Sequence, residues 1–324
     1  MTVCRESFPT RGSFTISRGS RTAVEVVLVE LQTGGHRGRG ECVPYARYGE
    51  TVEGVTGAIE SLRGELEAGR LDRPALQQAL PAGAARNALD CAFWDLEAKQ
   101  TGRRVWELAG LPAPGPLTTA YTLSLDTPDK MGAAAAANAE RPLLKLKLAG
   151  PEDLARVEAV RAGAPRAKLV VDANEGWDAD SYARIAPELA RLGVALVEQP
   201  LPAGADAALA DLPRPVPLCA DESCHDRSSL PQLRGRYDMV NVKLDKTGGL
   251  TEALALVAEA EAAGFQVMVG CMLATSLAMA PATLPAQRAQ VVDLDGPLLL
   301  AEDRDPPLEI DGSLVRPPAP ALWG

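Results

Sequence analysis

Charged residues that recur at nearly equal intervals constrain this chain more than any other feature. Lys147, Asp172, Glu198, Asp221 and Lys243 are separated by 25, 26, 23 and 22 residues, and each lies at or just beyond the end of a short apolar run. An interval of this size holds one strand, one helix and two loops. A charged residue that closes each strand of such a series is typical of the catalytic end of a parallel β/α barrel.

The apolar runs predict eight strands with helices between them. Their continuous Val and Leu character fits a fully buried parallel sheet. A doubly wound open sheet is the alternative, but it usually carries a glycine-rich phosphate-binding turn after its first strand, and none is found in this sequence. We therefore predict an α/β protein with a TIM-like (β/α)7β barrel over residues 116–300. The predicted strands are 117–125, 143–148, 168–174, 195–200, 216–223, 239–244, 265–272 and 290–297.

The residues before and after the barrel have a different pattern. Residues 22–31 form a β-branched run with a glycine-rich turn after it, and residues 83–100 place apolar side chains at helical spacing. A proline- and glycine-rich link at 110–116 closes this part. We predict an α+β capping domain over residues 1–115. Because no long helical pattern follows the eighth strand, the tail over residues 301–324 is predicted to return to that domain.

Composition excludes several classes of function. A net charge of −10 argues against nucleic acid or an anionic membrane as the partner, and no apolar stretch approaches the ~20 residues of a membrane span. The first residues lack the apolar segment of a secretory signal, so the cytoplasm is the predicted location. Six cysteines without paired spacing predict free thiols. The only histidines, His36 and His225, leave little material for a serine–histidine pair. The sequence allows a homo-oligomer and does not specify its size.

Three carboxylates predict a metal site. Asp172, Glu198 and Asp221 end consecutive strands, and they would repel one another strongly unless a cation neutralised them. All-oxygen ligation favours one Mg²⁺ per subunit, with Mn²⁺ as the second choice. Asn174 could hydrogen-bond to these ligands from the next layer outward. In the alternative interpretation each acid only caps the helix after its strand, which is less convincing for three consecutive units.

Lysines predict the acid/base groups. Lys145 and Lys147 are two apart on one strand and therefore project to the same face. Burying two ammonium groups is costly, so the alternative is a register that turns both toward solvent. Lys243 ends the sixth strand, which lies opposite the second in an eight-stranded barrel. Lys246 is its rival, but we expect it in the following loop.

Two opposed lysines suit one reaction, the removal of a proton from one face of a carbon and its return to the other. A proton α to a carboxylate is weakly acidic, so its removal requires a divalent cation that stabilises the enediolate. It also requires a base whose pKa is drawn toward neutrality, here by the cation and the Lys145 ammonium. Lys145 is also placed to hold the substrate carboxylate.

Further polar residues close the remaining strands. Asp293 and Asp295 end the eighth strand on one face, which suits a cationic substrate group such as an α-ammonium. Their alternative role is hydrogen bonding to the closing loop. Thr122 on the first strand and Cys271 after the seventh are predicted as polar substrate contacts at the rim, with packing as the alternative.

Several segments resemble the enolase superfamily in its muconate-lactonising branch, and within it the dipeptide epimerases of the L-Ala-D/L-Glu type. The lysine pair and the three spaced carboxylates are the superfamily's pattern, and DLDGP is the part specific to dipeptide substrates. The resemblance covers nearly the whole chain. Its segments are TISRGSR, GECVPYARYGE, LPAGAARNALDCAFWDLEAK, KLKL, VDANEGW, VEQPLP, ADESCH, VNVKLDKTGGLTEALAL, GCMLATS and DLDGP.

The resemblance implies 1,1-proton transfer at the α-carbon of the C-terminal residue of a dipeptide. It implies that the DLDGP aspartates hold the free amine of the dipeptide. It also implies that the capping domain covers the barrel mouth and offers Arg18, or alternatively Arg21, to a glutamate side chain. Recycling of cell-wall peptides is the setting it suggests. The other implied roles are acid/base groups for Lys147 and Lys243, Mg²⁺ ligands for Asp172, Glu198 and Asp221, and carboxylate binding for Lys145.

Two other functions stay open. A lyase or cycloisomerase such as o-succinylbenzoate synthase could share the metal ligands and lysines, but would have little use for the paired aspartates. A metal-dependent peptide binder without turnover is the second. A purely structural role leaves Lys145 and Lys147 without a reason.

Overall fold

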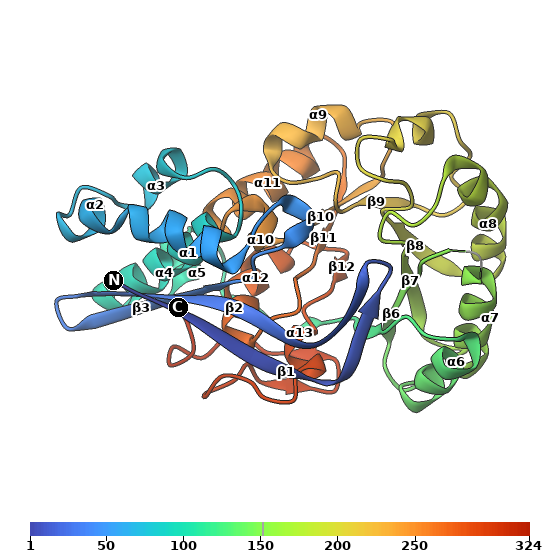
Figure 1. Cartoon of the computed structure of the whole chain (residues 1–324), viewed down its shortest axis with the longest axis horizontal. Helices are drawn as coiled ribbons and strands as arrows, with labels where there is room; N and C mark the ends of the chain where they lie inside the picture. Colours follow the sequence, from blue (N-terminus) through green and yellow to red (C-terminus); the bar gives the residue numbers. More distant parts are fainter. Residues whose placement is uncertain (151) are drawn as a thin grey trace.

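The computed structural model describes residues 1–150 and 152–324. The first part of the chain is an antiparallel sheet, in the order β1-β2-β3, with helices packed against it (Figure 1). Two long strands form a ribbon that reaches from this part across the barrel. The elements are β1 (Thr2–Ile16), β2 (Gly19–Thr33), β3 (His36–Cys42), η1 (Ala46–Tyr48), α1 (Val52–Ser61), α2 (Arg63–Glu67), α3 (Arg73–Ala79), α4 (Ala84–Thr101) and α5 (Val105–Leu108).

The second part is a curled parallel sheet whose eight strands follow chain order. Its two ends are joined by a backbone hydrogen bond in which Ala120 N donates to Val292 O at 2.8 Å. This confirms the predicted TIM-like barrel with an antiparallel cap. The strands are β5 (Tyr121–Leu123), β6 (Leu143–Lys147), β7 (Lys168–Asp172), β8 (Val194–Glu198), β9 (Leu218–Ala220), β10 (Met239–Val242), β11 (Gln266–Val269) and β12 (Val291–Val292).

Helices cover the outside of the sheet, and they are shortest after β8, β9 and β12. Among the described residues, no helix is long and apolar enough to cross a bilayer. The helices are α6 (Pro128–Ala137), α7 (Asp153–Gly163), α8 (Ala179–Arg191), η2 (Asp206–Ala210), η3 (Arg227–Ser229), α9 (Leu230–Leu233), α10 (Leu244–Thr247), α11 (Leu250–Ala262), α12 (Ser276–Ala286) and α13 (Gly296–Leu299).

The tail packs against the capping helices. Trp323 is buried and its indole nitrogen donates to Cys91 O at 3.0 Å, while Gly324 N donates to the carboxylate of Asp95 at 2.8 Å. On the way, β13 (Ile310–Asp311) and β14 (Leu314–Val315) form a small antiparallel sheet with β4 (Leu117–Thr118). The tail thus completes the cap, as the absence of a long helix after the eighth strand predicted.

Close packing of β3 on α4 predicts a large effect of one methyl group. A Cβ at Gly40 would overlap the carbonyl oxygen of Ala88. Both elements are fixed by their own hydrogen bonds, so we expect Gly40→Ala to lower the free energy of unfolding by about 1–3 kcal/mol in urea denaturation. Gly57→Ala on α1 is the control, because its Cβ meets nothing within 4 Å. That variant should be neutral or slightly stabilising. Equal stability of the two variants would contradict the packing argument.

Candidate active site

The barrel interior is built in layers, because side chains two residues apart on a strand point to the same face. One apolar layer takes a single residue from each strand or the segment just before it. Its members are Ala120, Leu143, Val170, Leu196, Cys219, Met239, Met268 and Val291. This layer closes the barrel below the site.

Two residues further along each strand, most of the inward-facing side chains are polar. This second layer consists of Thr122, Lys145, Asp172, Glu198, Asp221, Asn241, Gly270 and Asp293. The glycine is needed, since a Cβ at Gly270 would come within 2.7 Å of the Asn241 amide. The periodic charges of the sequence are therefore one ring of side chains above an apolar floor.

Lys145 lies at the centre of this ring. Its side chain is 1% exposed, and its Nζ lies 2.7 Å from Asp293 Oδ2, 2.6 Å from Glu198 Oε2 and 3.4 Å from Asp172 Oδ2. Lys147 is also buried. The alternative register, with both lysines turned toward solvent, does not occur.

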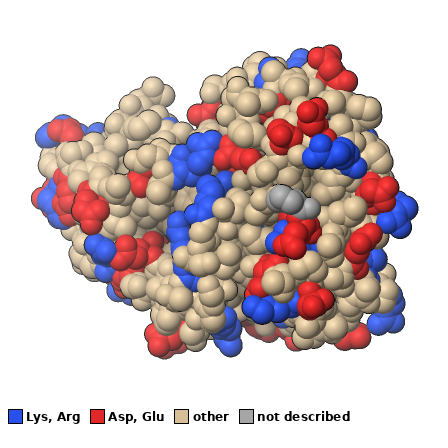
Figure 2. Space-filling view, turned by 45° about the vertical axis from the view of Figure 1, so that its right-hand side comes forward, with Lys and Arg blue, Asp and Glu red and all other residues tan. Residues whose placement is uncertain are grey.

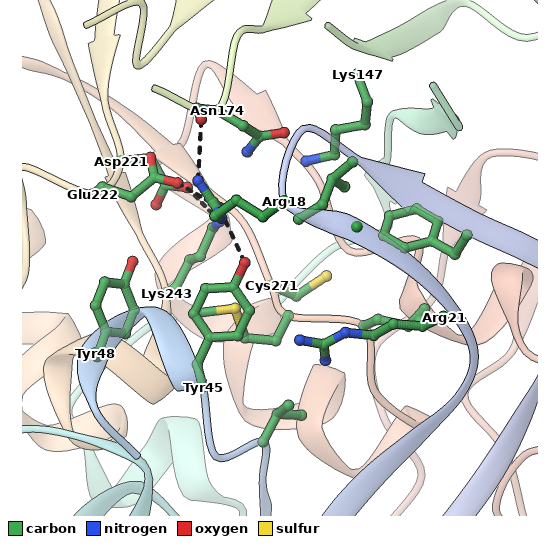
Figure 3. A pocket seen from close by; sticks show the side chains of 16 residues that line it. Arg18, Arg21, Tyr45, Tyr48, Lys147, Asn174, Asp221, Glu222, Lys243 and Cys271 are labelled. Carbon is green, nitrogen blue, oxygen red and sulfur yellow. Dashed lines mark hydrogen bonds and ion pairs between the residues drawn. The ribbon is translucent and has the colours of Figure 1, made fainter. Parts of the chain in front are cut away.

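Lys147 and Lys243 reach one cavity from different sides (Figure 3). Lys147 ends β6, and its Nζ lies 2.6 Å from Asp172 Oδ2. Lys243 follows β10, four strands further round the sheet, and its Nζ lies 2.6 Å from Asp221 Oδ2. A molecule in this cavity would therefore have an ammonium group on two sides.

The sequence predicted Lys246 in the loop after the sixth strand, but it lies in a short helix. It lies in α10, whose helical turn directs its side chain inward, and it is 1% exposed. Its Nζ donates to Asp221 Oδ1 at 2.6 Å, to Asp221 O at 2.6 Å and to Asn241 O at 2.9 Å. All three donors of this ammonium group are thus used, and Lys246 does not line the cavity.

The carboxylates meet lysines in this structure rather than one another. Among residues 1–150 and 152–324, no three His, Cys, Asp or Glu side chains already form a metal-ligand group. The donor set nevertheless fits a hard divalent cation: Asp172, Glu198 and Asp221 are buried carboxylates on three neighbouring strand ends. Glu198 Oε2 has no hydrogen-bond partner in the described chain, since its contact with Lys145 is close but poorly aligned.

The charges of the ring shift its pKa values in opposite directions. Burial alone would raise the pKa of Asp172, but Lys147 and Lys145 lower it to about 2. Burial would lower the pKa of Lys243, yet Asp221 and Glu198 outweigh burial and hold it well above the usual value. This direction reflects the carboxylates alone. The predicted lowering of the base pKa includes the charge of a bound divalent cation and stays a prediction.

The two aspartates that follow β12 have different environments. Asp293 pairs with Lys145, and its Oδ1 has no partner among the described residues. Asp295 Oδ2 accepts a hydrogen bond from Thr122 N at 2.5 Å, so its partner is the backbone of β5 rather than the closing loop considered as its alternative role. Burial and the Asp293 carboxylate raise the pKa of Asp295 to about 7. Cys271 lines the cavity, whereas Thr122 does not.

The capping domain covers the cavity with side chains from the β1–β2 turn and the loop after β3. Arg18 Nη2 donates to Glu222 Oε1 at 2.8 Å and to the Tyr45 hydroxyl at 3.0 Å (Figure 3). Arg21 lies over the Tyr45 ring, 5.7 Å from its centroid, and no ion pair of its side chain is found within the described chain. Basic side chains gather along the boundary between cap and barrel (Figure 2). This boundary therefore suits an anionic molecule.

Three polar residues that line the cavity were not predicted from the sequence. Glu222 directly follows the candidate ligand Asp221, so its position one step past a strand end was an available signal. Tyr45 and Tyr48 lie in GECVPYARYGE, a segment that carried the resemblance but no predicted role. The resemblance implied that the capping domain covers the barrel mouth, but it gave neither tyrosine a role.

Asp245 joins the cap to the segment that carries Lys243. Its burial leads us to expect that the stability of the protein depends on pH. Asp245 Oδ1 accepts from Val43 N at 3.0 Å and from Asn87 Nδ2 at 2.9 Å. Burial raises the pKa of Asp245 from 3.8 to about 7. Between these two pH values the unfolded chain loses a proton that the folded chain keeps, so ionisation of this group opposes folding increasingly as pH rises.

We therefore expect Asp245→Asn to stabilise the protein at pH 8 by about 1–2 kcal/mol relative to wild type, and to change little at pH 4. An amide keeps the acceptor oxygen but carries no charge. Urea denaturation at the two pH values measures the difference, with exposed Asp211→Asn as the control. A variant destabilised equally at both values would contradict the assignment.

Comparison with known proteins places the chain in a family. Residues 130–321 match the enolase C-terminal domain-like family, and residues 1–110 match the N-terminal domain of the mandelate racemase/muconate lactonizing enzyme family. The chain belongs to the mandelate racemase/muconate lactonizing group of the enolase superfamily. The chain is 50% identical to the L-Ala-D/L-Glu epimerase of Escherichia coli over 95% of this chain and 96% of that one. It is 47% identical to the N-acetyl-D-glutamate racemase of a Pseudoalteromonas species over 89% and 91%.

Solved structures agree over almost the full length. An enolase family member from Agrobacterium tumefaciens, described as homologous to dipeptide epimerases and holding sodium and L-Ala-L-Glu, superposes with a TM-score of 0.98 at 56% identity, covering 100% of this chain and 99% of that one. A dipeptide epimerase from Enterococcus faecalis V583, complexed with Mg and L-Leu-L-Tyr, gives 0.90 at 28% identity, covering 98% and 96%.

Proposed function

We propose that this protein is a Mg²⁺-dependent dipeptide epimerase, which inverts the α-carbon of the C-terminal residue of a dipeptide such as L-Ala-D/L-Glu. The observation that carries the proposal is the placement of Lys147 and Lys243 on strands four apart, both lining one cavity above a ring of buried carboxylates. The E. coli relative and the dipeptide-bound structures support the same activity.

The two lysines would divide the proton transfer between them. One takes the α-proton as base, and the other returns a proton to the opposite face, so that the carbon inverts and no net proton is consumed. Lys145, which is buried among the carboxylates of the ring, would hold the substrate carboxylate. Asp293 and Asp295 would bind the free amine; their support is the unpartnered oxygen of Asp293 and the family segment DLDGP.

Asp172, Glu198 and Asp221 would hold the Mg²⁺. When bound, the cation supplies positive charge that stabilises the carboxylate oxygens while the α-proton is absent. The three side chains are buried and lie on adjacent strands, which supports their joint role. Asn241 Nδ2 donates to Glu198 Oε1 at 2.7 Å and would orient that ligand.

The function is tested by incubating a dipeptide library with the protein and Mg²⁺ in D₂O. We expect one α-deuterium per inverted C-terminal residue, best with acidic side chains, and complete loss of incorporation with excess EDTA that Mg²⁺ restores. A peptide binder without turnover would give no deuterium. A lyase or cycloisomerase would leave the dipeptides unchanged, and either result would overturn the proposal.

Racemisation of an N-acylated glutamate is a second candidate, supported by the Pseudoalteromonas relative. Such a substrate has no free amine for Asp295 to bind. Asp295→Asn should therefore lower kcat/KM for L-Ala-L-Glu about tenfold or more, because it removes a charged partner of the ammonium group, but should leave N-acetyl-glutamate turnover nearly unchanged. Similar losses with both substrates would argue against amine binding by Asp295.

The acidic side chain of the substrate is proposed to meet Arg21. Arg18, the arginine favoured from sequence, already donates hydrogen bonds to Glu222 and Tyr45. Arg21 also lines the cavity, and its guanidinium forms no ion pair within the described residues. Arg21→Met should lower kcat/KM for L-Ala-L-Glu roughly 10- to 100-fold, as expected for loss of a charge-assisted contact, and L-Ala-L-Leu should be affected far less. An equal loss for both dipeptides would contradict this role.

The setting belongs to the proposal as well. We propose a cytoplasmic enzyme that acts on cell-wall peptide fragments. The six cysteines support a reducing compartment, since none forms a disulfide in the described chain.

A further inference from the structure

The loop after β7 has an unusual backbone. Asn174 and Glu175 are consecutive non-glycine residues with φ of 45° and 65°. Such left-handed conformations are unfavourable for residues other than glycine and persist where the surroundings hold them. Here Asn174 N donates to Asp172 Oδ1 and Glu175 N donates to Gln199 O, both at 2.9 Å.

This corner presents acceptors to the capping domain. The Glu175 carboxylate takes two parallel hydrogen bonds from Arg47, with Nε at 2.6 Å and Nη2 at 2.7 Å, and a third from Ala203 N at 2.8 Å. Arg18 Nη1 lies 3.4 Å from the same carboxylate. The carbonyl of Asn174 accepts from the Ser17 hydroxyl and from Arg18 Nη1, both at 3.1 Å.

Two separate capping segments thus converge on one barrel loop. Ser17 and Arg18 form the turn between β1 and β2, and Arg47 lies in η1, between Tyr45 and Tyr48 of the cavity wall. The side chain of Glu175 is 10% exposed and that of Arg47 is 36% exposed, so their bidentate pair is screened by water mainly on the arginine side. The hydrogen bond with Glu175 also raises the pKa of Arg47.

We propose that Glu175 is a positioning residue, which latches both capping segments onto the barrel and thereby sets Arg18 and Tyr45 over the catalytic cavity. The latch lies outside the proton-transfer machinery, since Lys147 and Lys243 are carried by the barrel itself. Its effect on turnover rests on the proposed epimerase function, whereas its effect on the capping segments does not.

The test compares Glu175→Gln with Arg47→Met, which removes the same pair from the other side and leaves the left-handed turn untouched. Glu188→Gln is the matched control, because it breaks the exposed Arg191–Glu188 pair on α8. Hydrogen–deuterium exchange of residues 44–49 should become about five- to tenfold faster in both latch variants, and the double variant should add little. Exchange of residues 14–19 should rise less and only in Glu175→Gln, because the carbonyl of Asn174 still accepts from Ser17 and Arg18. The control and the barrel strands should exchange as in wild type.

Kinetics provide the second readout. We expect KM for L-Ala-L-Glu to rise about fivefold in both latch variants while kcat changes less than about twofold, because the lysines keep their positions. Unchanged exchange of both segments in properly folded Glu175→Gln and Arg47→Met would overturn the latch, whatever the activity. A wild-type protein that turns over no dipeptide would instead overturn the proposed function, and the exchange data would still decide the latch.

Discussion

Replacing Lys147 or Lys243 by methionine should abolish epimerisation, with a loss of about a thousandfold or more. General acid–base catalysis contributes typically 10²–10⁴-fold, and inversion requires one group on each face of the carbon. Methionine keeps most of the side-chain length and removes only the ammonium group. The measurement is the rate at which L-Ala-L-Glu converts to L-Ala-D-Glu.

The two variants should differ in a further respect. Each retains one lysine, which can still remove and return a proton on its own face. Each should therefore exchange the α-proton of one epimer with D₂O without inverting it, and the two variants should select opposite epimers. Lys168→Met is the control, because Lys168 is exposed at the start of β7. Exchange of both epimers by one variant would show that the lysines do not act from opposite faces.

The barrel and its charged ring were predictable because both depend on local periodicity. The intervals of 22–26 residues between charges give the β/α repeat, and the two-residue period of a strand puts Lys145 and Lys147 on one face. The same arithmetic predicted that strands two and six are opposed. None of these inferences requires knowledge of contacts between distant segments.

The family resemblance implied that the capping domain covers the barrel mouth, but the contacts that hold it there were not predictable, because they join segments far apart in sequence. Arg18 and Glu222 are 204 residues apart, and their ion pair exists only because the β1–β2 ribbon crosses the barrel mouth. The predicted position of Lys246 was wrong for a local reason. The sequence suggested that a loop follows the sixth strand, whereas the helical turn of α10 directs the Lys246 side chain inward. Its burial is stabilised by the three acceptors around Nζ.

Glu198→Gln should produce the second large effect, a fall of about a thousandfold or more in kcat. The Glu198 carboxylate lies 2.6 Å from the ammonium group of Lys145, and it is also proposed to hold the Mg²⁺ with two other buried carboxylates. Loss of the negative charge would weaken either interaction. Activity alone therefore cannot identify the partner, and Mg²⁺ binding must be measured by calorimetry in the absence of substrate.

If Glu198 is a metal ligand, Mg²⁺ affinity should fall roughly 100-fold or more, since even partners behind a ligand typically account for 10- to 100-fold. Glutamine retains an oxygen that can accept from Asn241, so the side chain can keep its place and the loss reports the charge. Exposed Glu188→Gln should bind Mg²⁺ as wild type does. Unchanged Mg²⁺ affinity together with lost activity would show that Glu198 acts as the partner of Lys145 and not as a metal ligand. A carboxylate that pairs only with the Lys145 ammonium group affects substrate binding and leaves Mg²⁺ binding unchanged.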